Sequence, residues 1–305
     1  MCVTLRELLG GPAPVVLDGA LATELEACGA DLQDALWSAR VLADDPAAIE
    51  AVHVAYLRAG AQVLVTASYQ ASVEGFTALG MSADAAEALL RRSVALAQQA
   101  RERVGVAALV AASVGPYGAV LAGGQEYTGD YGSTSERQVE AFHERRLRVL
   151  LAAGPDCVAC ETIPRLSEAA TLARVLDRLD GPDAWISFSC RDGRVTSHGE
   201  PIEDAVAAAV SSPRVVAVGV NCTAPEHVAE LLARARTATD RPLVAYPNNG
   251  RAWDALSRRW SDAGAPTLPQ SAIADWVQAG ARLIGGCCGF GPEAVRTIAE
   301  TLGRR

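Results

Sequence analysis

VVAVGVNC (residues 215–222) and LIGGCC (residues 283–288) are two apolar runs that both end in cysteine. Neither alternates between apolar and polar residues, and a nearly continuous apolar run of this length is typical of a strand buried on both faces. Six further runs of the same kind are VVLDGA (15–20), QVLVTASY (62–69), ALVAASVG (108–115), CVACET (157–162), WISFSC (185–190) and PLVAYPN (242–248). The sequence therefore predicts eight buried parallel strands.

Longer amphipathic segments separate these runs. Residues 47–60 and 82–105 carry apolar residues at helical spacing, and each segment stops at a glycine. Ser133 with Glu136 fits a capping box for a further helix. Four more helices are expected after prolines that suit a first helical turn, namely Pro164, Pro201, Pro225 and Pro292. Eight strand–helix units predict an α/β fold, a (β/α)₈ TIM-type barrel, with a doubly wound sheet as the alternative.

The length of 305 residues fits one such barrel, so we expect a single domain over residues 1–305. Two long segments interrupt the regular alternation. Residues 115–132, rich in Gly and Tyr, are expected to form a loop after the third strand, and residues 253–269 a loop after the seventh. The length and glycine content of segments 115–132 and 251–269 favour a lid over the barrel mouth.

Charge and hydropathy exclude several classes of partner. The formal net charge is -9 and the pI is about 5.0, which disfavours binding to nucleic acid or to an anionic membrane. The N-terminal residues lack a basic segment followed by a long apolar run, and no stretch approaches the roughly 20 apolar residues of a membrane span. We therefore expect a soluble cytoplasmic protein.

Three of the eight cysteines end the sixth and eighth predicted strands. Cys222 ends the sixth strand, and Cys287 and Cys288 end the eighth. The carboxyl ends of barrel strands form the mouth in which TIM barrels carry out catalysis, so the three thiols are expected to converge there. Zn²⁺ takes thiolate ligands in a tetrahedron, and a catalytic site leaves one position open. Adjacent cysteines on a regular strand face opposite sides, so the backbone must bend, which the surrounding glycines allow.

Other interpretations of the cysteines remain open. Cys28, Cys157, Cys160 and Cys190 are better explained as buried apolar side chains. Cys157 and Cys160 form a CxxC pair, but residues three apart in a strand face opposite sides, which disfavours a shared metal or redox role. Cys287 and Cys288 could form a strained vicinal disulfide, although that would not account for Cys222 at the same mouth.

Several short motifs resemble those of the homocysteine S-methyltransferase family. They are VGVNC (218–222), PNNG (247–250), GGCCG (285–289), LDGALATEL (17–25), TASYQAS (66–72), GPYGA (115–119), EYTGDY (126–131) and ETIP (161–164). The motifs span essentially the whole chain in order, and NC together with GGCCG is the most specific. SYQAS and EYTGDY are most similar to members that use S-methylmethionine or S-adenosylmethionine. Betaine-using members carry tyrosine where this chain has Gln70, which counts against betaine.

The resemblance implies a zinc-dependent barrel enzyme that methylates the thiol of L-homocysteine and gives methionine. The three zinc-binding cysteines of the family match Cys222, Cys287 and Cys288. The aspartate and glutamate that bind the substrate amino acid match Asp18 and Glu161, and carboxylates pair well with an ammonium group. From the residues alone, Asp18 is equally a turn residue and Glu161 equally a charge at a helix N-terminus.

The substrate carboxylate needs hydrogen-bond donors. The resemblance points to the backbone N–H groups of Gly19 and Ala20. The turn GFGPEA (289–294), which precedes the last expected helix, is a second anion-site candidate by its position. Asn221 lies beside the predicted zinc site as a further substrate-binding residue, and Asn248 fits ordinary strand-end hydrogen bonding.

The methyl donor implied by the resemblance is a sulfonium cation, which aromatic faces can hold. Candidates by position are Tyr69, Tyr117, Tyr246 and Trp253. Three alternatives remain: methylation of another thiol or selenol such as selenocysteine, a phosphate-binding barrel with inert cysteines, and a zinc or redox sensor without enzyme activity.

Overall fold

The computed structural model describes residues 3–30, 37–250, 253–254, 259–260 and 268–304. Eight parallel strands pair in the order β1-β10-β7-β6-β5-β4-β3-β2, and a parallel bridge between Leu17 and Val63 joins the two edges. The strands are β1 (Val15–Val16), β2 (Val63–Val65), β3 (Leu109–Val114), β4 (Cys157–Ile163), β5 (Ala184–Phe188), β6 (Val215–Asn221), β7 (Leu243–Tyr246) and β10 (Ala281–Ile284). The predicted (β/α)₈ barrel is therefore confirmed.

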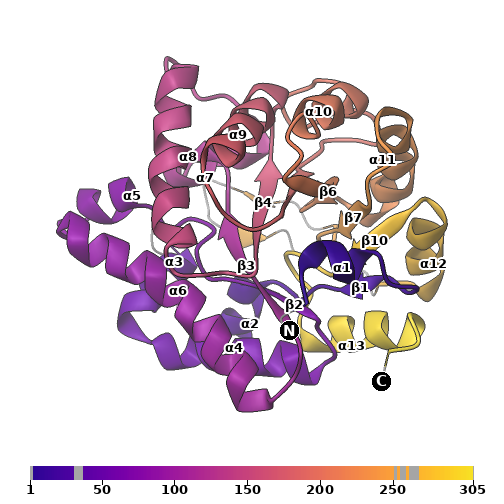
Figure 1. Ribbon diagram of the computed structural model, residues 1–305, viewed down its shortest axis with the longest axis horizontal. Helices are drawn as coiled ribbons and strands as arrows, with labels where there is room; N and C mark the ends of the chain where they lie inside the picture. Colours follow the sequence, from indigo (N-terminus) through magenta and orange to yellow (C-terminus); the bar gives the residue numbers. More distant parts are fainter. Residues whose placement is uncertain (1–2, 31–36, 251–252, 255–258, 261–267, 305) are drawn as a thin grey trace.

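Helices surround the strands (Figure 1). They are α1 (Leu5–Leu9), α2 (Leu21–Ala27), α3 (Trp37–Asp44), α4 (Pro46–Arg58), α5 (Val73–Ala78), α6 (Ala83–Val104), α7 (Tyr117–Leu121), the 3₁₀ helix η1 (Gln125–Tyr127), α8 (Glu136–Leu151), α9 (Leu166–Arg178), α10 (Ile202–Ala209), α11 (Pro225–Ala238), α12 (Gln270–Gln278) and α13 (Pro292–Thr301). No helix in the described ranges is long and apolar enough to cross a membrane.

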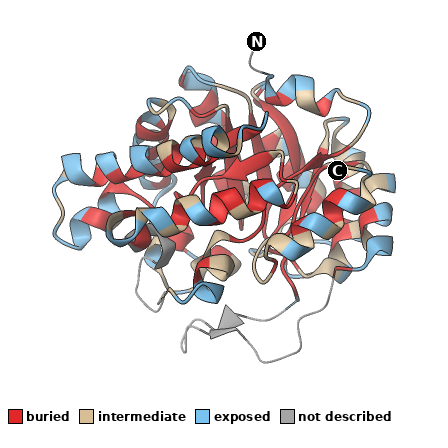
Figure 2. Cartoon of the chain, turned by 90° about the horizontal axis from the view of Figure 1, so that it is seen from below, coloured by how far each residue is buried: buried red, intermediate tan, exposed pale blue. Residues whose placement is uncertain are grey.

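The core has two layers, because each strand buries both of its faces. One set of side chains, including Trp185 and Leu283, fills the barrel interior, and Leu5 and Leu9 of α1 pack into the same cluster. A larger set fills the space between the strands and the surrounding helices, whose inner faces are buried and outer faces exposed (Figure 2). Cys157 belongs to the interior cluster and Cys160 to the outer one, as the CxxC spacing predicted.

Several local predictions need correction or fall outside the described residues. Cys28 was expected to be buried and is exposed. Residues 115–132 are not one loop, since they contain α7 and η1. The capping box is formed by Ser135 and Gln138 rather than by Ser133 and Glu136. Within 251–269, the structure describes only a two-stranded ladder, β8 (Trp253–Asp254) with β9 (Arg259–Trp260), and residues 268–269. The lid predicted for this segment therefore lies largely outside the described residues.

Candidate active site

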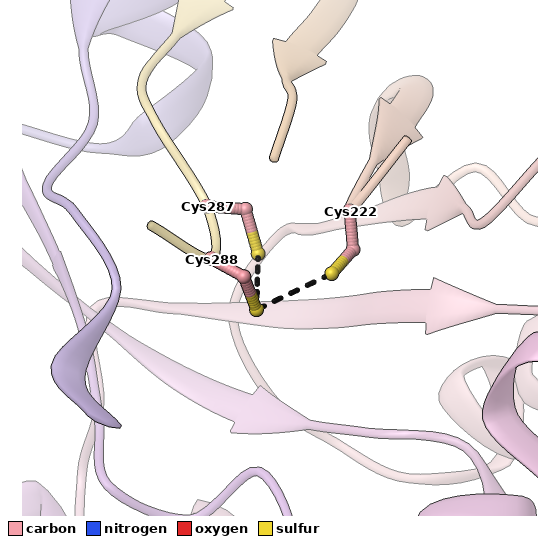
Figure 3. A group of neighbouring side chains, drawn as sticks. All are labelled: Cys222, Cys287 and Cys288. Carbon is pink, nitrogen blue, oxygen red and sulfur yellow. Dashed lines mark hydrogen bonds between the residues drawn. The ribbon is translucent and has the colours of Figure 1, made fainter. Parts of the chain in front are cut away.

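The three cysteines converge at the carboxyl ends of β6 and β10. Cys222 Sγ lies 3.4 Å from Cys288 Sγ, and Cys287 Sγ lies 3.9 Å from Cys288 Sγ (Figure 3). All three sulfur atoms lie within 4.8 Å of one another. The structure thus brings together the three residues that the sequence singled out.

Backbone conformations unusual for regular strands make this convergence possible. Cys222 has φ +48°, in the left-handed region that non-glycine residues rarely adopt. Gly289 has φ +84°, and a Cβ placed there would lie 2.0 Å from Asn249 Nδ2. Gly286 leaves equally little room, because its Cβ would lie 2.6 Å from Phe290 Cβ. A residue larger than glycine would therefore clash at these positions, which explains why the turn after β10 is rich in glycine.

The cysteine triad fits a thiophilic divalent metal. A tetrahedral zinc ion with Zn–S distances of about 2.3 Å spaces its sulfur ligands about 3.8 Å apart, close to the separations of 3.4 and 3.9 Å. Hydrogen bonds from Cys287 and Cys288 hold the pKa of Cys222 well below its ordinary value. The pKa values of Cys287 and Cys288 are raised, chiefly by hydrogen bonding with Cys222. A cation would relieve this conflict among three adjacent thiols.

Tyr127 completes the surroundings of the cysteines. Its hydroxyl lies 3.1 Å from Cys222 Sγ. Burial raises the pKa of Tyr127 well above its usual range, whereas the pKa of Cys222 is lowered by its thiol donors. The phenol therefore keeps its proton and donates to the sulfur. The motif EYTGDY had pointed to this stretch, but nothing in the sequence assigned Tyr127 this contact.

A cavity opens beside the three sulfur atoms at the barrel mouth. Its lining comprises residues 19–22, 65–67, 69–70, 126–127 and 161–162 with Ser113, Cys222, Tyr246, Cys287 and Cys288. Of the aromatic residues predicted to face a cation, Tyr69 and Tyr246 are in this lining. Tyr117 instead packs edge-on against Tyr131 and Phe142, and the side chain of Trp253 lies outside the described part of the structure.

Glu161 is the predicted carboxylate that faces the cavity. Its side chain is 6% exposed, and it accepts a short hydrogen bond from the Ser113 hydroxyl. Burial raises the pKa of Glu161 to about 7, although the Ser113 hydroxyl opposes the rise. The carboxyl group can therefore gain or lose a proton near neutral pH and would bind a cation most strongly when ionised.

Asp18 lies behind the cavity wall. Its Oδ2 accepts from the Val65 N–H at 2.7 Å, and its Oδ1 accepts from the Tyr246 hydroxyl at 2.9 Å. Burial raises its pKa well above the ordinary value. Asp18 thus joins β2 and β7 to the turn that follows β1, and it fixes the orientation of Tyr246.

The turn after β1 brings Gly19 and Ala20 into the cavity lining. A Cβ at Gly19 would lie 2.5 Å from Tyr56 Cε1 and 2.6 Å from the Phe290 carbonyl oxygen, so only glycine fits. The Ala20 N–H donates to that carbonyl at 3.1 Å. Of the two predicted backbone donors, the Ala20 N–H is thus already engaged.

Asn221 is fully buried and ties three strands together. Its Oδ1 accepts from the Thr162 N–H at 2.6 Å and from the Ser187 hydroxyl at 2.8 Å, and its Nδ2 donates to Thr162 Oγ1 at 2.7 Å. These bonds hold the backbone that carries Glu161 next to the backbone that carries Cys222. Asn248, at the end of the next strand, accepts from the Gly250 N–H at 2.9 Å.

Residues 289–294 form the turn and the first residues of α13, as predicted. A Cβ at Gly291 would lie 2.9 Å from Glu24 Oε2, so a carboxylate packs against this helix start. A carboxylate in that place already complements the partial positive charge of the helix N-terminus and repels a phosphate. The geometry therefore disfavours the phosphate-binding alternative.

A buried network holds the segment that carries Tyr127. Glu168 of α9 accepts from the Tyr117 N–H at 2.7 Å, from the Tyr131 hydroxyl and from His143 Nε2 at 2.8 Å. Arg146, which can only donate, lies 3.3 Å from His143 Nδ1, so Nδ1 is the acceptor and Nε2 carries the proton. Burial lowers the pKa of His143, which keeps the ring neutral. His143 thus helps to hold this segment, and no histidine is among the described residues that line the cavity.

A TIM barrel whose mouth holds three convergent cysteines beside a carboxylate-lined cavity defines a class of barrel enzyme with a candidate metal site. The sequence profile of the family described as homocysteine S-methyltransferase matches residues 15–302. The chain is 49% identical to homocysteine S-methyltransferase 4 of Zea mays, over 94% of this chain and 89% of that protein. It is 46% identical to homocysteine S-methyltransferase of Escherichia coli strain K12, over 96% of this chain and 97% of that protein. The chain belongs to the homocysteine S-methyltransferase family.

Solved structures agree with this assignment. The crystal structure of the homocysteine methyltransferase MmuM from Escherichia coli in its metallated form superposes with a TM-score of 0.87 and 44% identity. The match covers 97% of this chain and 99% of that one. An oxidized form of the same protein gives a TM-score of 0.86 with 97% and 98% coverage. The fold and its extent are thus shared with a metal-binding relative.

Proposed function

We propose that this enzyme transfers a methyl group from a sulfonium donor to the thiol of L-homocysteine and forms methionine, with Zn²⁺ held by Cys222, Cys287 and Cys288. The observation that carries the proposal is the convergence of three sulfur atoms within 4.8 Å at the edge of the cavity. The names of the maize and Escherichia coli relatives support homocysteine as acceptor. The metallated form of the Escherichia coli relative supports a metal.

The cavity residues would orient homocysteine. Glu161 receives the ammonium group, because it is a buried carboxylate that lines the cavity. The Gly19 N–H is the remaining backbone donor of its turn for the substrate carboxylate. Asp18 acts by holding Tyr246 and this turn, and Asn221 by holding the backbone beside Glu161 and Cys222.

The reaction is a displacement between two sulfur atoms. A zinc ion on the three thiolates would supply the Lewis acidity that keeps the homocysteine sulfur, otherwise mostly protonated at neutral pH, in its nucleophilic form. The bond between the donor sulfur and its methyl carbon breaks, the donor leaves as a neutral thioether, and the new bond forms methionine. Opposite charges cancel in this step, so an enclosed cavity that excludes water favours it. Tyr69 and Tyr246 line the cavity, and their rings would face the cation.

S-methylmethionine is our first choice of donor and S-adenosylmethionine the second. Gln70 lies in the cavity lining, and its identity sets this chain apart from the betaine-using pattern. Selenocysteine is an acceptor that the same arrangement would admit. The seven cysteines of the described ranges are all free, which suits a reducing compartment such as the cytoplasm.

The test measures bound zinc and methionine formation in the purified protein and in the Cys288→Ala variant. We expect about one zinc per chain in the unaltered protein, and loss of both zinc and activity in the variant, since two thiolates hold the ion far less tightly. Cys28→Ala is the matched control, because Cys28 is exposed and lies outside the cluster.

Zinc-free protein after purification under reducing conditions would contradict the metal site. Zinc without methyl transfer to homocysteine from either sulfonium would keep the site and contradict the reaction. Competition between homocysteine and selenocysteine in the same assay decides which acceptor is preferred.

A further inference from the structure

Two buried side chains that line the cavity each have one hydrogen-bond acceptor without a partner among the described residues. Glu126 Oε2 and Gln70 Oε1 are both buried, and neither has a donor within hydrogen-bonding distance. The side chains are 5% and 3% exposed, and both residues line the cavity beside Cys222. Buried polar atoms are nearly always paired, because an unpaired one loses its hydration without compensation. Unpaired acceptors in a ligand cavity therefore indicate a ligand that brings donors.

Both side chains are held in place by neighbouring structure. Gln70 Nε2 donates to the Ala119 carbonyl of α7 at 2.9 Å, which fixes the amide so that its oxygen is the unpaired atom. The Glu126 carbonyl accepts from the Ser189 hydroxyl at 2.9 Å. A Cβ at Gly118 would lie 2.8 Å from the Glu126 N atom, so η1 packs directly against α7. Gln70, through its hydrogen bond, and Glu126, through the packing of η1, are thus both held against α7.

The chemistry of the pair selects the ligand. An ionised carboxylate and an amide oxygen both accept hydrogen bonds, so the complementary group is a cation with N–H donors, and an ammonium group fits best. Burial raises the pKa of Glu126 to about 7, so this pairing is strongest above neutral pH. Of the described residues that line the cavity, none is lysine, arginine or histidine. The cavity is therefore suited to a ligand with net positive charge. An amino-acid sulfonium carries two positive charges and one carboxylate, whereas homocysteine is a neutral zwitterion.

The position of Glu126 relates this subsite to the reacting atoms. Glu126 directly precedes Tyr127, whose hydroxyl lies 3.1 Å from Cys222 Sγ. Glu126 lines the same cavity as Cys222, Cys287 and Cys288, so an ammonium group held by Glu126 and a methyl group delivered to the cysteines would share one cavity. Only a short carbon chain joins the sulfonium and ammonium groups of S-methylmethionine and of S-adenosylmethionine.

We propose that Glu126 and Gln70 form the subsite that receives the α-ammonium group of an amino-acid sulfonium, and that this subsite makes the enzyme selective for amino-bearing donors. The inference rests on the proposed function and gives a role to Glu126, the second carboxylate that lines the cavity. Glu161 serves the acceptor amino acid, and Glu126 serves the donor.

The test is titration calorimetry of the zinc-loaded enzyme with two sulfonium compounds. S-methylmethionine is compared with (3-carboxypropyl)dimethylsulfonium, which lacks only the amino group. We expect the unaltered protein to bind S-methylmethionine at least about tenfold more tightly, because a charge-assisted hydrogen bond is lost with the analogue. Glu126→Gln should abolish most of this preference, whereas Glu161→Gln, the matched buried carboxylate, should retain it.

Steady-state kinetics give a second, reciprocal readout. Glu126→Gln should raise the KM for S-methylmethionine about tenfold and leave the KM for homocysteine within about twofold, and Glu161→Gln should do the reverse. Equal binding of the two sulfonium compounds by the unaltered protein would overturn the inference without any variant. So would a preference that persists in Glu126→Gln, or a change confined to the KM for homocysteine.

The outcomes separate this inference from the proposed reaction. A calorimetric preference for the amino-bearing donor without any methionine formed contradicts the reaction and supports the subsite. Methionine formed by an enzyme that binds both donors equally contradicts the subsite alone. Zinc content and melting temperature of each variant confirm that it is folded.

Discussion

Two residues of the site have a backbone conformation in the left-handed region, although neither is glycine. Thr162 has φ +60° and Cys222 has φ +48°. Such conformations cost on the order of 1–3 kcal/mol each and persist where surrounding contacts enforce them. Asn221 supplies those contacts, since it precedes Cys222 and bonds to both the N–H and the hydroxyl of Thr162. One buried amide thus positions the first cysteine and the neighbour of Glu161 together.

The protonation of Glu161 should control acceptor binding. Burial raises its pKa to about 7 in the folded protein, above the ordinary value of 4.5, so the fold favours the protonated form. Pairing with an ammonium needs the ionised form, and kcat/KM for homocysteine should therefore fall as the pH drops through about 7. Ser113→Ala removes a hydrogen bond to the carboxylate, which should raise this pKa by about one further unit and shift the acidic limb to higher pH.

The pH profile of kcat/KM at saturating donor measures this shift. Ser93→Ala is the control, because the Ser93 hydroxyl is buried but donates to the Leu90 carbonyl within α6. An acidic limb that stays in place in Ser113→Ala would show that Glu161 does not limit acceptor binding.

At the scale of elements, α7 and η1 depend on one carboxylate from α9. Burial alone would raise the pKa of Glu168, but hydrogen bonds from His143, the Tyr117 N–H and the Tyr131 hydroxyl outweigh it and lower the pKa. Glu168→Gln leaves these donors without a charged acceptor, and we expect a loss of about 3 kcal/mol in unfolding free energy. Hydrogen exchange should also increase over residues 117–131, because this segment loses its anchor.

Chemical denaturation and amide exchange check that expectation. Glu144→Gln is the control on α8, since Glu144 forms only exposed ion pairs with Arg148 and Arg178 and should change neither measurement. Increased exchange spread evenly over the barrel, rather than concentrated in residues 117–131, would indicate general destabilisation instead of a local anchor.

The same elements show which structure the sequence could predict. Buried strands are recognisable in the sequence as continuous apolar runs, and each of the eight predicted runs overlaps a strand of the barrel. Short helices such as α7 and η1 cannot be recognised from a local apolar pattern. They are held by Glu168, which lies 51 residues from Tyr117 in the chain. The sequence predicts the capping box two residues too early. Ser133 and Ser135 are both followed three residues later by a side chain that can close the box, so the motif alone does not distinguish them.

At the scale of the whole molecule, barrel geometry explains why the cysteine cluster was predictable and Glu126 was not. Cys222, Cys287 and Cys288 end predicted strands, so the fold itself carries them to one mouth. Glu126 and Tyr127 reach the same mouth from a long connection whose path depends on tertiary contacts. Only the short motif EYTGDY marked them, and a motif does not say which atom a side chain meets.

Metal binding should stabilise the barrel without being needed to fold it. Of the three cysteines only Cys287 packs against the two-layer core, and it is only partly buried there, whereas a zinc ion would link the ends of β6 and β10. A ligand at about 1,000 times its Kd stabilises the native state by about 4 kcal/mol. Chelation should therefore lower the melting temperature by roughly 5–10 °C, with unchanged helical circular dichroism at 25 °C.

The control for this prediction is chelation of the Cys288→Ala variant. That variant should already melt at the lower temperature, and a chelator should not lower it further, because the ion is absent from the start. Re-addition of zinc should restore the original melting temperature only when all three cysteines are present. If chelation instead unfolded the protein at 25 °C, the barrel would need the metal to remain folded, and its buried core alone would not be sufficient.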